Sequence, residues 1–209
     1  KIFRSVNSKI SNGSKPNLKV LDITVEEQPT GEISAGAGVG TNGGSFAFTV
    51  KENNWLGEGK RVGFDVEVNA ESLKGSLNYS NPNYDFLGNK INYSVYSVTN
   101  DKPEQGYENS LIGAGVSTSF EQYKDLYTSL GISASLDDLK TDNSATDSLK
   151  KQSGNFTEIS GNYGFTFDKR NRAFMPTSGS ILKFNQTVPL LADKAFIGNN
   201  FSSSFYKSF

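Results

Sequence analysis

Apolar and polar residues alternate in about ten separate stretches of the chain, and this period of two constrains the fold more than any other feature. Between Ile33 and Val39, for example, each apolar residue is followed by serine or glycine. Successive side chains of a strand point to opposite faces of the sheet. Helix periodicity is hard to find. The sequence therefore predicts an all-β, antiparallel protein, with strands near 33–39, 46–50, 62–68, 73–79, 91–95, 111–116, 126–136, 159–167, 180–188 and 197–209.

The polar face of these stretches decides between two all-β classes. It includes the charged residues Arg61, Asp65 and Glu67, which would be costly to bury in the core of a β-sandwich. They are compatible with a water-filled lumen. Strands of about 10 residues with one apolar and one polar face are typical of a transmembrane β-barrel. The alternative is a soluble antiparallel sheet with one solvated face, which the same alternation would also produce.

Composition excludes several kinds of active site. The chain contains no histidine and no cysteine, which rules out a Ser-His-Asp triad, a cysteine nucleophile, a disulfide and the usual zinc sites. Four aspartates, Asp137, Asp138, Asp142 and Asp147, lack the spacing of an EF-hand loop. The net charge of -1 gives no indication of a nucleic-acid partner. We therefore expect no metal, cofactor or nucleic-acid ligand.

The predicted connections fall into two alternating sets. One set is short, near 54–59, 84–90, 121–124 and 171–179, and the other is more variable and polar, near 41–44, 69–72, 99–107, 137–156 and 189–197. Outer-membrane barrels have short periplasmic turns and longer external loops. The first strand would therefore rise from the periplasm, and the second would descend to the turn that contains Trp55.

The N-terminal part differs from the rest. Residues 1–28 read as two strands joined by a polar link, and the following Pro29-Thr30-Gly31 breaks the pattern. We expect residues 1–29 to be the end of a small soluble domain with a hinge, and residues 30–209 to be a partial barrel. The last stretch stops inside a strand pattern, so the sequence is expected to be a fragment of a longer protein.

Four segments resemble the BamA-type outer-membrane protein assembly factors. "LKVLDITVEEQPTGEISAGAGVGT" (18–41) is similar to the end of the last periplasmic POTRA domain and the first barrel strand. "SFAFTVKENNWLGEGKRVGFDV" (45–66) resembles the next hairpin with its Asn-Trp-Leu-Gly-x-Gly turn. "LNYSNPNYDFLGNK" (77–90) resembles an Asn-Pro-Tyr segment, although Asn83 intervenes, and "YGFTFDKRNRAFMPTSGSILKF" (163–184) resembles an Asp/Arg-rich strand end with Phe-x-Pro-Thr-x-Gly.

This resemblance implies a transmembrane barrel of about 16 strands, of which this chain would hold roughly the first ten after the C-terminal piece of a POTRA domain. It implies a factor that folds and inserts other β-barrel proteins through an edge-strand lateral gate and that is not an enzyme. Its partners would be outer-membrane protein substrates, Bam-type accessory lipoproteins and the lipid bilayer. Its place would be the outer membrane of a Gram-negative cell, with the N-terminal segment in the periplasm. The alternatives are a secretion pore or a translocation and assembly module of the same superfamily, and a plain porin.

The resemblance also names the gate strand, which this sequence builds from small residues. The expected edge runs through Glu32, Ile33, Ser34, Ala35, Gly36, Ala37, Gly38, Val39 and Gly40. Interior glycines weaken a strand and permit close backbone approach, and weakly specified register would let a seam open. The alternative is that these glycines relieve crowding from neighbouring side chains or ease barrel curvature.

Two further sets of residues are candidates for lesser roles. Asp168 continues the inward-facing register of its strand, and with Arg170 it is a candidate for polar contacts in the lumen. Trp55 is expected at headgroup depth, because indole favours the membrane–water boundary. Gly57 and Gly59 would supply the tight backbone of its turn.

Overall fold

The computed structural model describes residues 3–15, 17–40 and 43–208. These residues form two antiparallel sheets, one of two strands and one of ten. The small sheet pairs β1 (Phe3–Asn12) with β2 (Lys19–Glu27). The large sheet contains β3 (Gly31–Gly40), β4 (Gly43–Trp55), β5 (Lys60–Asn69), β6 (Ser72–Asn81), β7 (Lys90–Lys102), β8 (Tyr107–Tyr123), β9 (Leu126–Thr141), β10 (Gly154–Asp168), β11 (Ser178–Ala192) and β12 (Gly198–Lys207).

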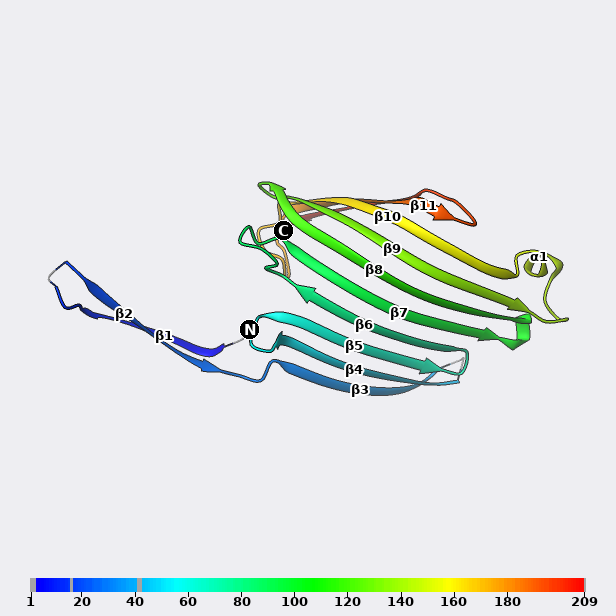
Figure 1. Ribbon diagram of the computed structural model, residues 1–209, viewed down its shortest axis with the longest axis horizontal. Coiled ribbons are helices and arrows are strands. Elements are labelled where there is room, and N and C mark those ends of the chain that lie inside the picture. Colours follow the sequence, from blue (N-terminus) through cyan, green and yellow to red (C-terminus); the bar gives the residue numbers. More distant parts are fainter. Residues whose placement is uncertain (1–2, 16, 41–42, 209) are drawn as a thin grey trace.

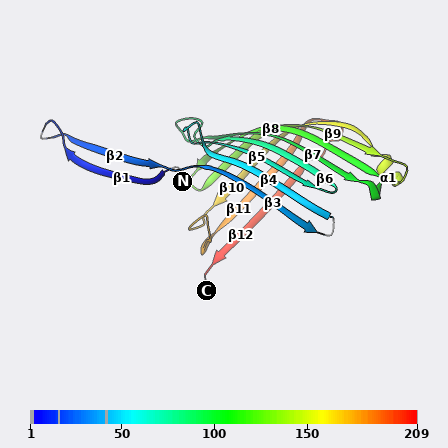
Figure 2. The same ribbon diagram turned by 90° about the horizontal axis from the view of Figure 1, so that it is seen from below.

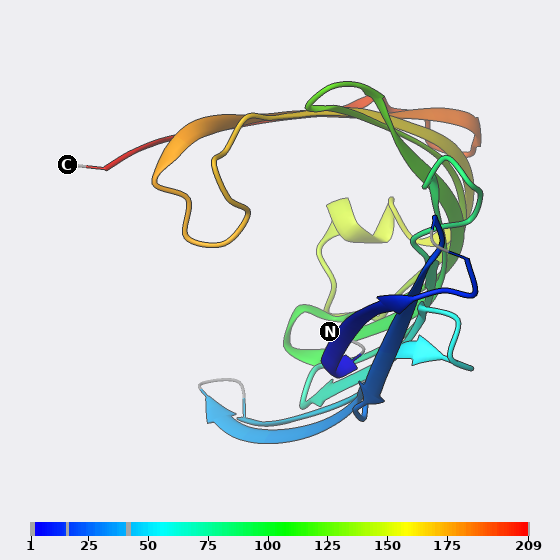
Figure 3. The same ribbon diagram turned by 90° about the vertical axis from the view of Figure 1, so that its left-hand side faces the viewer.

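The large sheet is a simple meander in which every strand pairs with its neighbours in sequence. It curls into an open trough (Figure 1 and Figure 3). Its two outer strands are β3 and β12, and within the described residues neither has a partner on its outer edge. The hairpin β1–β2 projects away from the large sheet (Figure 2). The ten strands predicted from the alternation are therefore present.

Cross-strand register separates the two faces. Directly opposed residues share a face of an antiparallel sheet, so Val50, Phe64, Leu77 and Val95 form one continuous apolar row over four strands. On the other face, the neighbouring row contains Thr49, Asp65, Ser76 and Tyr96. Phe64, Leu77 and Val95 are each between 42% and 51% exposed. An apolar surface as extensive as this one indicates a wall that faces lipid rather than water.

The polar face is the concave one. The connection after β9 contains a short helix, α1 (Asp147–Lys150), whose N-terminus is capped by the Thr146 hydroxyl. Figure 3 places α1 on the inner side of the trough. Gln152, just after α1, lines one cavity together with Tyr96 and Ser135 of the polar face. The polar side chains therefore line the lumen, as the sequence predicts. Within the described residues, no helix is long and apolar enough to cross a membrane.

The connections alternate between the two ends of the sheet, as predicted, but their predicted length difference is wrong. The expected short set includes the long connections 82–89 and 169–177, whereas the expected longer set includes 70–71. Residues 137 and 138, expected in a loop, lie in β9, since pairing with β8 and β10 extends β9 to Thr141. Polar composition does not reveal how far two strands stay paired. The expectations on Thr41 and Asn42 lie outside the described residues.

The hairpin β1–β2 has one apolar face, which includes Val6, Ile10, Leu21 and Ile23, all more than half exposed. Its last strand ends at Glu27, and β3 begins at Gly31. The change from the small sheet to the large one falls at residues 28–30, and a hinge there stays a prediction. The assignment of residues 1–29 to a POTRA domain stays a prediction.

Candidate functional site

The candidate gate strand β3 lies at the edge of the large sheet. It pairs only with β4 among the described strands, from Gly31 opposite Glu52 to Gly40 opposite Gly43. All ten of its residues are exposed. Ile33 and Val39 on its apolar face are 76% and 93% exposed. A strand edge of this kind presents a row of backbone N–H and C=O groups to whatever approaches it.

Two of the β3 glycines, Gly36 and Gly40, have room around them among the described residues. A Cβ atom at Gly36 or Gly40 would meet no described atom within 4 Å, and at Gly38 it would lie 3.2 Å from Ser45 Oγ. Relief of crowding, the alternative explanation, therefore has no support from the described residues at Gly36 and Gly40. Ser45 Oγ donates to the Gly38 carbonyl at 3.5 Å, which is at the outer limit for a hydrogen bond. The outer half of β3 is thus held mainly by backbone pairing.

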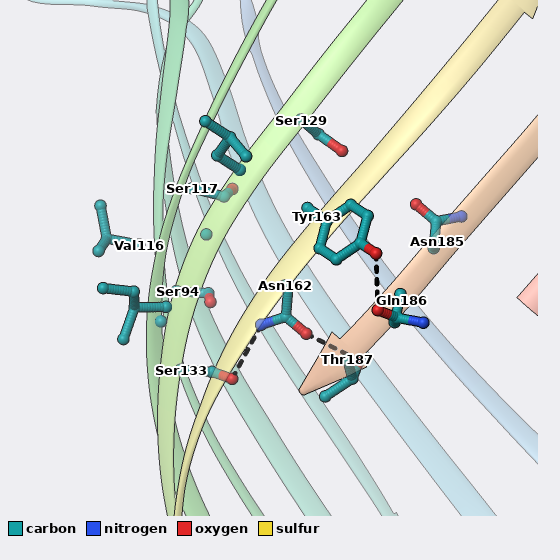
Figure 4. Close-up of a pocket in the computed structure, with 14 residues that line it drawn as sticks. Ser94, Val116, Ser117, Ser129, Ser133, Asn162, Tyr163, Asn185, Gln186 and Thr187 are labelled. Atoms are coloured by element: carbon teal, nitrogen blue, oxygen red, sulfur yellow. Dashed lines mark hydrogen bonds between the residues drawn. The ribbon is translucent and has the colours of Figure 1, made fainter. Parts of the chain in front are cut away.

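Strands β9–β12, at the other side of the sheet from β3, are joined by side-chain hydrogen bonds on both faces. On the lumen face, Asn162 donates to Ser133 Oγ at 3.1 Å and accepts from Thr187 Oγ1 at 2.9 Å, linking β9, β10 and β11 (Figure 4). On the apolar face, Tyr163 donates to Gln186 Oε1 at 2.6 Å (Figure 4), and Gln186 Nε2 donates to Asn199 of β12 at 2.6 Å. Polar groups that face lipid are costly unless they are paired, so these contacts fix the register of β10–β12.

A compact network holds the base of β3. The Thr30 hydroxyl and the Asn54 backbone N–H both donate to Glu52 Oε1, the second at 2.7 Å. The Thr30 carbonyl accepts from the backbone N–H of Asn53 at 3.3 Å and from its side-chain amide at 3.0 Å. Thr30, the residue that leads into β3, is therefore tied to the end of β4 by three hydrogen bonds. The sequence reading missed this network, because no local pattern pairs Thr30 with Glu52.

The Trp55 turn at the end of β4 is tight. Leu56, Gly57 and Gly59 have φ values of 57°, 76° and 69°, a region that favours glycine. The Asn54 side chain closes the turn by accepting from the Gly59 N–H at 2.7 Å. Trp55 lies opposite Lys60, on the face of Val62, and is 46% exposed. This places the indole on the apolar face at the rim of the sheet, next to a cation.

Asp168 and Arg170 form one unit. The Arg170 Nε and Nη2 atoms donate to the two Asp168 carboxylate oxygens at 2.9 Å and 2.7 Å. This fork geometry is the strong form of an arginine–carboxylate pair, and it raises the pKa of Arg170. The two side chains are 26% and 19% exposed. Asp168 lies opposite Ile181 on the lumen face, and its partner Arg170 lies in the turn that follows β10. A role of this pair in lumen contacts stays a prediction.

The other two cations of this turn, Lys169 and Arg172, also have partners within the turn or the adjoining strand end. Lys169 lies over the Phe167 ring, 5.1 Å from its centroid, and Arg172 Nε donates to the Met175 carbonyl at 2.7 Å. Within the described part of the chain, no group of three or more histidine, cysteine, aspartate or glutamate residues could hold a metal ion. The candidate site consists of the edge strand β3 and the side chains that hold its base.

Comparison with known proteins identifies the family. The model of the Omp85 superfamily domain matches residues 54–209. The chain belongs to the Omp85 superfamily. The trough described above is therefore part of an outer-membrane β-barrel wall, and the predicted fold class is confirmed.

Individual Omp85 relatives agree with this assignment. The chain is 28% identical over 200 residues to the outer membrane protein assembly factor BamA of Neorickettsia risticii (strain Illinois), covering 90% of this chain and 26% of that protein. It is 25% identical over 214 residues to the sorting and assembly machinery component 50 homolog of Homo sapiens, covering 99% and 45%. This chain thus spans less than half the length of either relative.

A solved structure shares the fold. The crystal structure of BamA from Haemophilus ducreyi lacking POTRA domains 1–3 superimposes with a TM-score of 0.77 at 19% identity. The match covers 96% of this chain and 42% of that chain. The resemblance to BamA-type proteins drawn from the sequence motifs is therefore confirmed at the level of family and fold.

Proposed function

We propose that this Omp85 chain forms the first part of the barrel of an outer-membrane protein assembly factor, and that β3 is the edge that receives an incoming strand. The observation that carries the proposal is the geometry of β3. It is an outer strand of the sheet, it is exposed along its whole length, and Gly36 and Gly40 have space around them among the described residues. The relatives named as assembly components support the same function.

The physical reason for using a strand edge is the lack of hydrogen-bond partners in lipid. A strand can enter the bilayer core only if its backbone groups are satisfied. An exposed edge satisfies them by accepting the new strand through β-augmentation. No covalent chemistry is needed, and the factor acts as a template rather than as an enzyme.

The uneven distribution of side-chain hydrogen bonds over the sheet supports a seam at β3. Side-chain hydrogen bonds with distances of 2.6–3.1 Å cross β9, β10, β11 and β12. In the outer half of β3, by contrast, glycine and alanine alternate with few polar groups. Strands that lack side-chain contacts have weakly specified register. The wall would therefore yield at its β3 edge before it yields elsewhere.

The proposal includes partners and location. The substrates are unfolded outer-membrane β-barrel proteins, and the helpers are accessory lipoproteins of the Bam type. The complete barrel has about 16 strands and follows a POTRA domain in the periplasm. The relatives come from bacteria and from human, so they do not single out one kind of outer membrane. We propose the outer membrane of a Gram-negative cell. In this setting Trp55, with Gly57 and Gly59, anchors the periplasmic rim, and Asp168 and Arg170 face the lumen.

The experiment replaces Gly36 with valine in the full-length protein and measures the rate of substrate assembly in liposomes. A Cβ atom at Gly36 meets no described atom within 4 Å, so the variant is expected to fold. The β-branched side chain favours the paired strand by up to about 1 kcal/mol, which corresponds to an assembly rate about fivefold lower. Gly36→Val combined with Gly38→Val should lower the rate further.

Gly63→Val is the matched control. Gly63 also lies on the lumen face of a strand, where a Cβ atom would make only an ordinary contact, 3.8 Å from the Lys51 side chain. This variant stiffens β5 but leaves the edge unchanged, and its assembly rate should equal that of the wild type. An unchanged rate in a normally folded Gly36→Val, Gly38→Val protein would refute the gate role of β3.

A further inference from the structure

The hydrogen bonds that join Thr30 to Glu52 and Asn53, called the clasp below, include a carboxylate in an unusual place. Glu52 lies opposite Gly31 and Val62, and it follows Phe48 and Val50 on the apolar face of β4. A charge on the lipid-facing side of a barrel is costly unless it lies near the interface and has partners. Glu52 is near the end of β4, and Thr30 and Asn54 both donate to its Oε1 atom. Solvation alone therefore does not explain why a carboxylate occupies this position.

The residue opposite Glu52 fits the carboxylate. A Cβ atom at Gly31 would lie 3.1 Å from Glu52 Oε2, which is tighter than an ordinary contact. Glycine at this position lets the carboxylate lie close against the first residue of β3. Two features, the hydroxyl of Thr30 and the absent side chain of Gly31, thus bring Glu52 to the place where β3 begins.

Thr30 is also a junction. It lies between the end of the hairpin at Glu27 and the start of β3 at Gly31. Its hydroxyl is held by Glu52, while its carbonyl is held by the backbone and side-chain amides of Asn53. Any movement of the hairpin that pulls on β3 must first act on this clasp.

We infer that Glu52 is a positioning residue that pins the base of β3, so that the strand opens from its Gly36–Gly40 end. The inference rests on the proposed function of β3 as the receiving edge. The pinned base keeps the register of the first residues of β3, and an incoming strand then pairs with an edge whose start is fixed. The free outer end supplies the movement that the seam needs.

The experiment uses four variants of the full-length protein in liposomes and follows backbone hydrogen exchange. Glu52→Ala and Thr30→Val each remove the hydrogen bond between the Thr30 hydroxyl and the Glu52 carboxylate, whereas Glu52→Gln and Thr30→Ser keep an oxygen in each position. The first pair should exchange about tenfold faster at residues 31–35, the order of one lost hydrogen bond. The second pair should match the wild type, and residues 36–40 should exchange fast in every protein. Glu52→Ala should also assemble substrate more slowly, and Glu52→Gln should restore the rate.

Glu67→Ala is the matched control, because it removes a strand carboxylate from β5 whose ion-pair partner is Lys74, at 3.7 Å. Its exchange at residues 31–35 should not change. The inference is overturned if Glu52→Ala leaves exchange at 31–35 as in the wild type. It is equally overturned if exchange rises throughout the sheet, or if Glu52→Gln fails to restore protection. A wild-type protein that assembles no substrate would instead refute the proposed function, and exchange alone would then decide whether the clasp exists.

Discussion

Replacing Gly179 with alanine tests how the turn beside Asp168 and Arg170 is built. Gly179 has a φ of 100°, which side chains rarely adopt. A Cβ atom there would lie 2.0 Å from the Lys169 carbonyl oxygen. That oxygen belongs to the backbone of the facing strand end, where the Lys169 N–H also donates to Ser180 at 2.8 Å. A rotamer change cannot relieve this overlap, so β10 and β11 would have to separate.

Two other glycines allow the destabilisation by Gly179→Ala to be separated into a conformational term and a steric term. Gly57 has a φ of 76° but open space around its Cβ position, so Gly57→Ala should cost only the conformational term of about 1–2 kcal/mol. Gly75 has open space and no left-handed conformation, and Gly75→Ala should be neutral or stabilising by about 0.4–1 kcal/mol. Gly179→Ala adds an overlap of about 1–3 kcal/mol to the conformational term, which gives a loss of about 2–5 kcal/mol.

The measurement is the urea dependence of unfolding of the three full-length variants in lipid vesicles, followed by the loss of heat-modifiable migration on gels. The expected order of destabilisation is Gly179→Ala, then Gly57→Ala, then Gly75→Ala. A Gly179→Ala protein within about 1 kcal/mol of the wild type, a loss no larger than that of a surface change, would show that the turn has another conformation. The Asp168–Arg170 fork would then lose its structural basis.

Two further predictions concern the rim. Trp55 is the one tryptophan of the chain, so its fluorescence should be quenched by lipids brominated near the headgroup and only weakly by lipids brominated at the chain ends; the reverse order would remove Trp55 from the interface. Asp85, in the connection 82–89, accepts from the backbone N–H groups of Asn89 and Leu87, and these bonds lower its pKa. A lowered pKa means stabilisation that is present at neutral pH and lost as the pH falls below about 4. Protection factors of the Leu87 and Asn89 amides should fall there, and Asp85→Asn should abolish this pH dependence; an unchanged pH profile in Asp85→Asn would contradict the assignment.

The strands and their faces were predictable because their signal is local. Ile33, Ala35, Ala37 and Val39 lie on one face of β3 whatever its partners are, since the period of two belongs to the extended backbone itself. The same reasoning put Asp168 on the polar face of its strand, where it lies opposite Ile181; its role as a lumen contact stays a prediction. Connection lengths were predicted poorly. Asp137 and Asp138 look like loop residues, but two neighbouring strands keep them paired in β9.

The candidate site was predictable only in part. The sequence motifs pointed to β3 and to the Asp168–Arg170 turn, and the structure adds what holds each of them. It shows that Asp168 and Arg170 bind one another through a two-bonded fork. It also shows the Tyr163–Gln186–Asn199 chain on the apolar face, although a glutamine between Phe184 and Val188 in an alternating stretch was a signal that could have been noticed.

The sequence by itself determined the class of fold, the two faces of each strand and the glycine-rich composition of the edge strand. These follow from residue type and period, which act over a few neighbours. Only the tertiary structure decided that Thr30 meets Glu52 across 22 residues and that the outer half of β3 lacks such ties. Antiparallel register sets these contacts, and register depends on the pairing of whole strands rather than on any short segment.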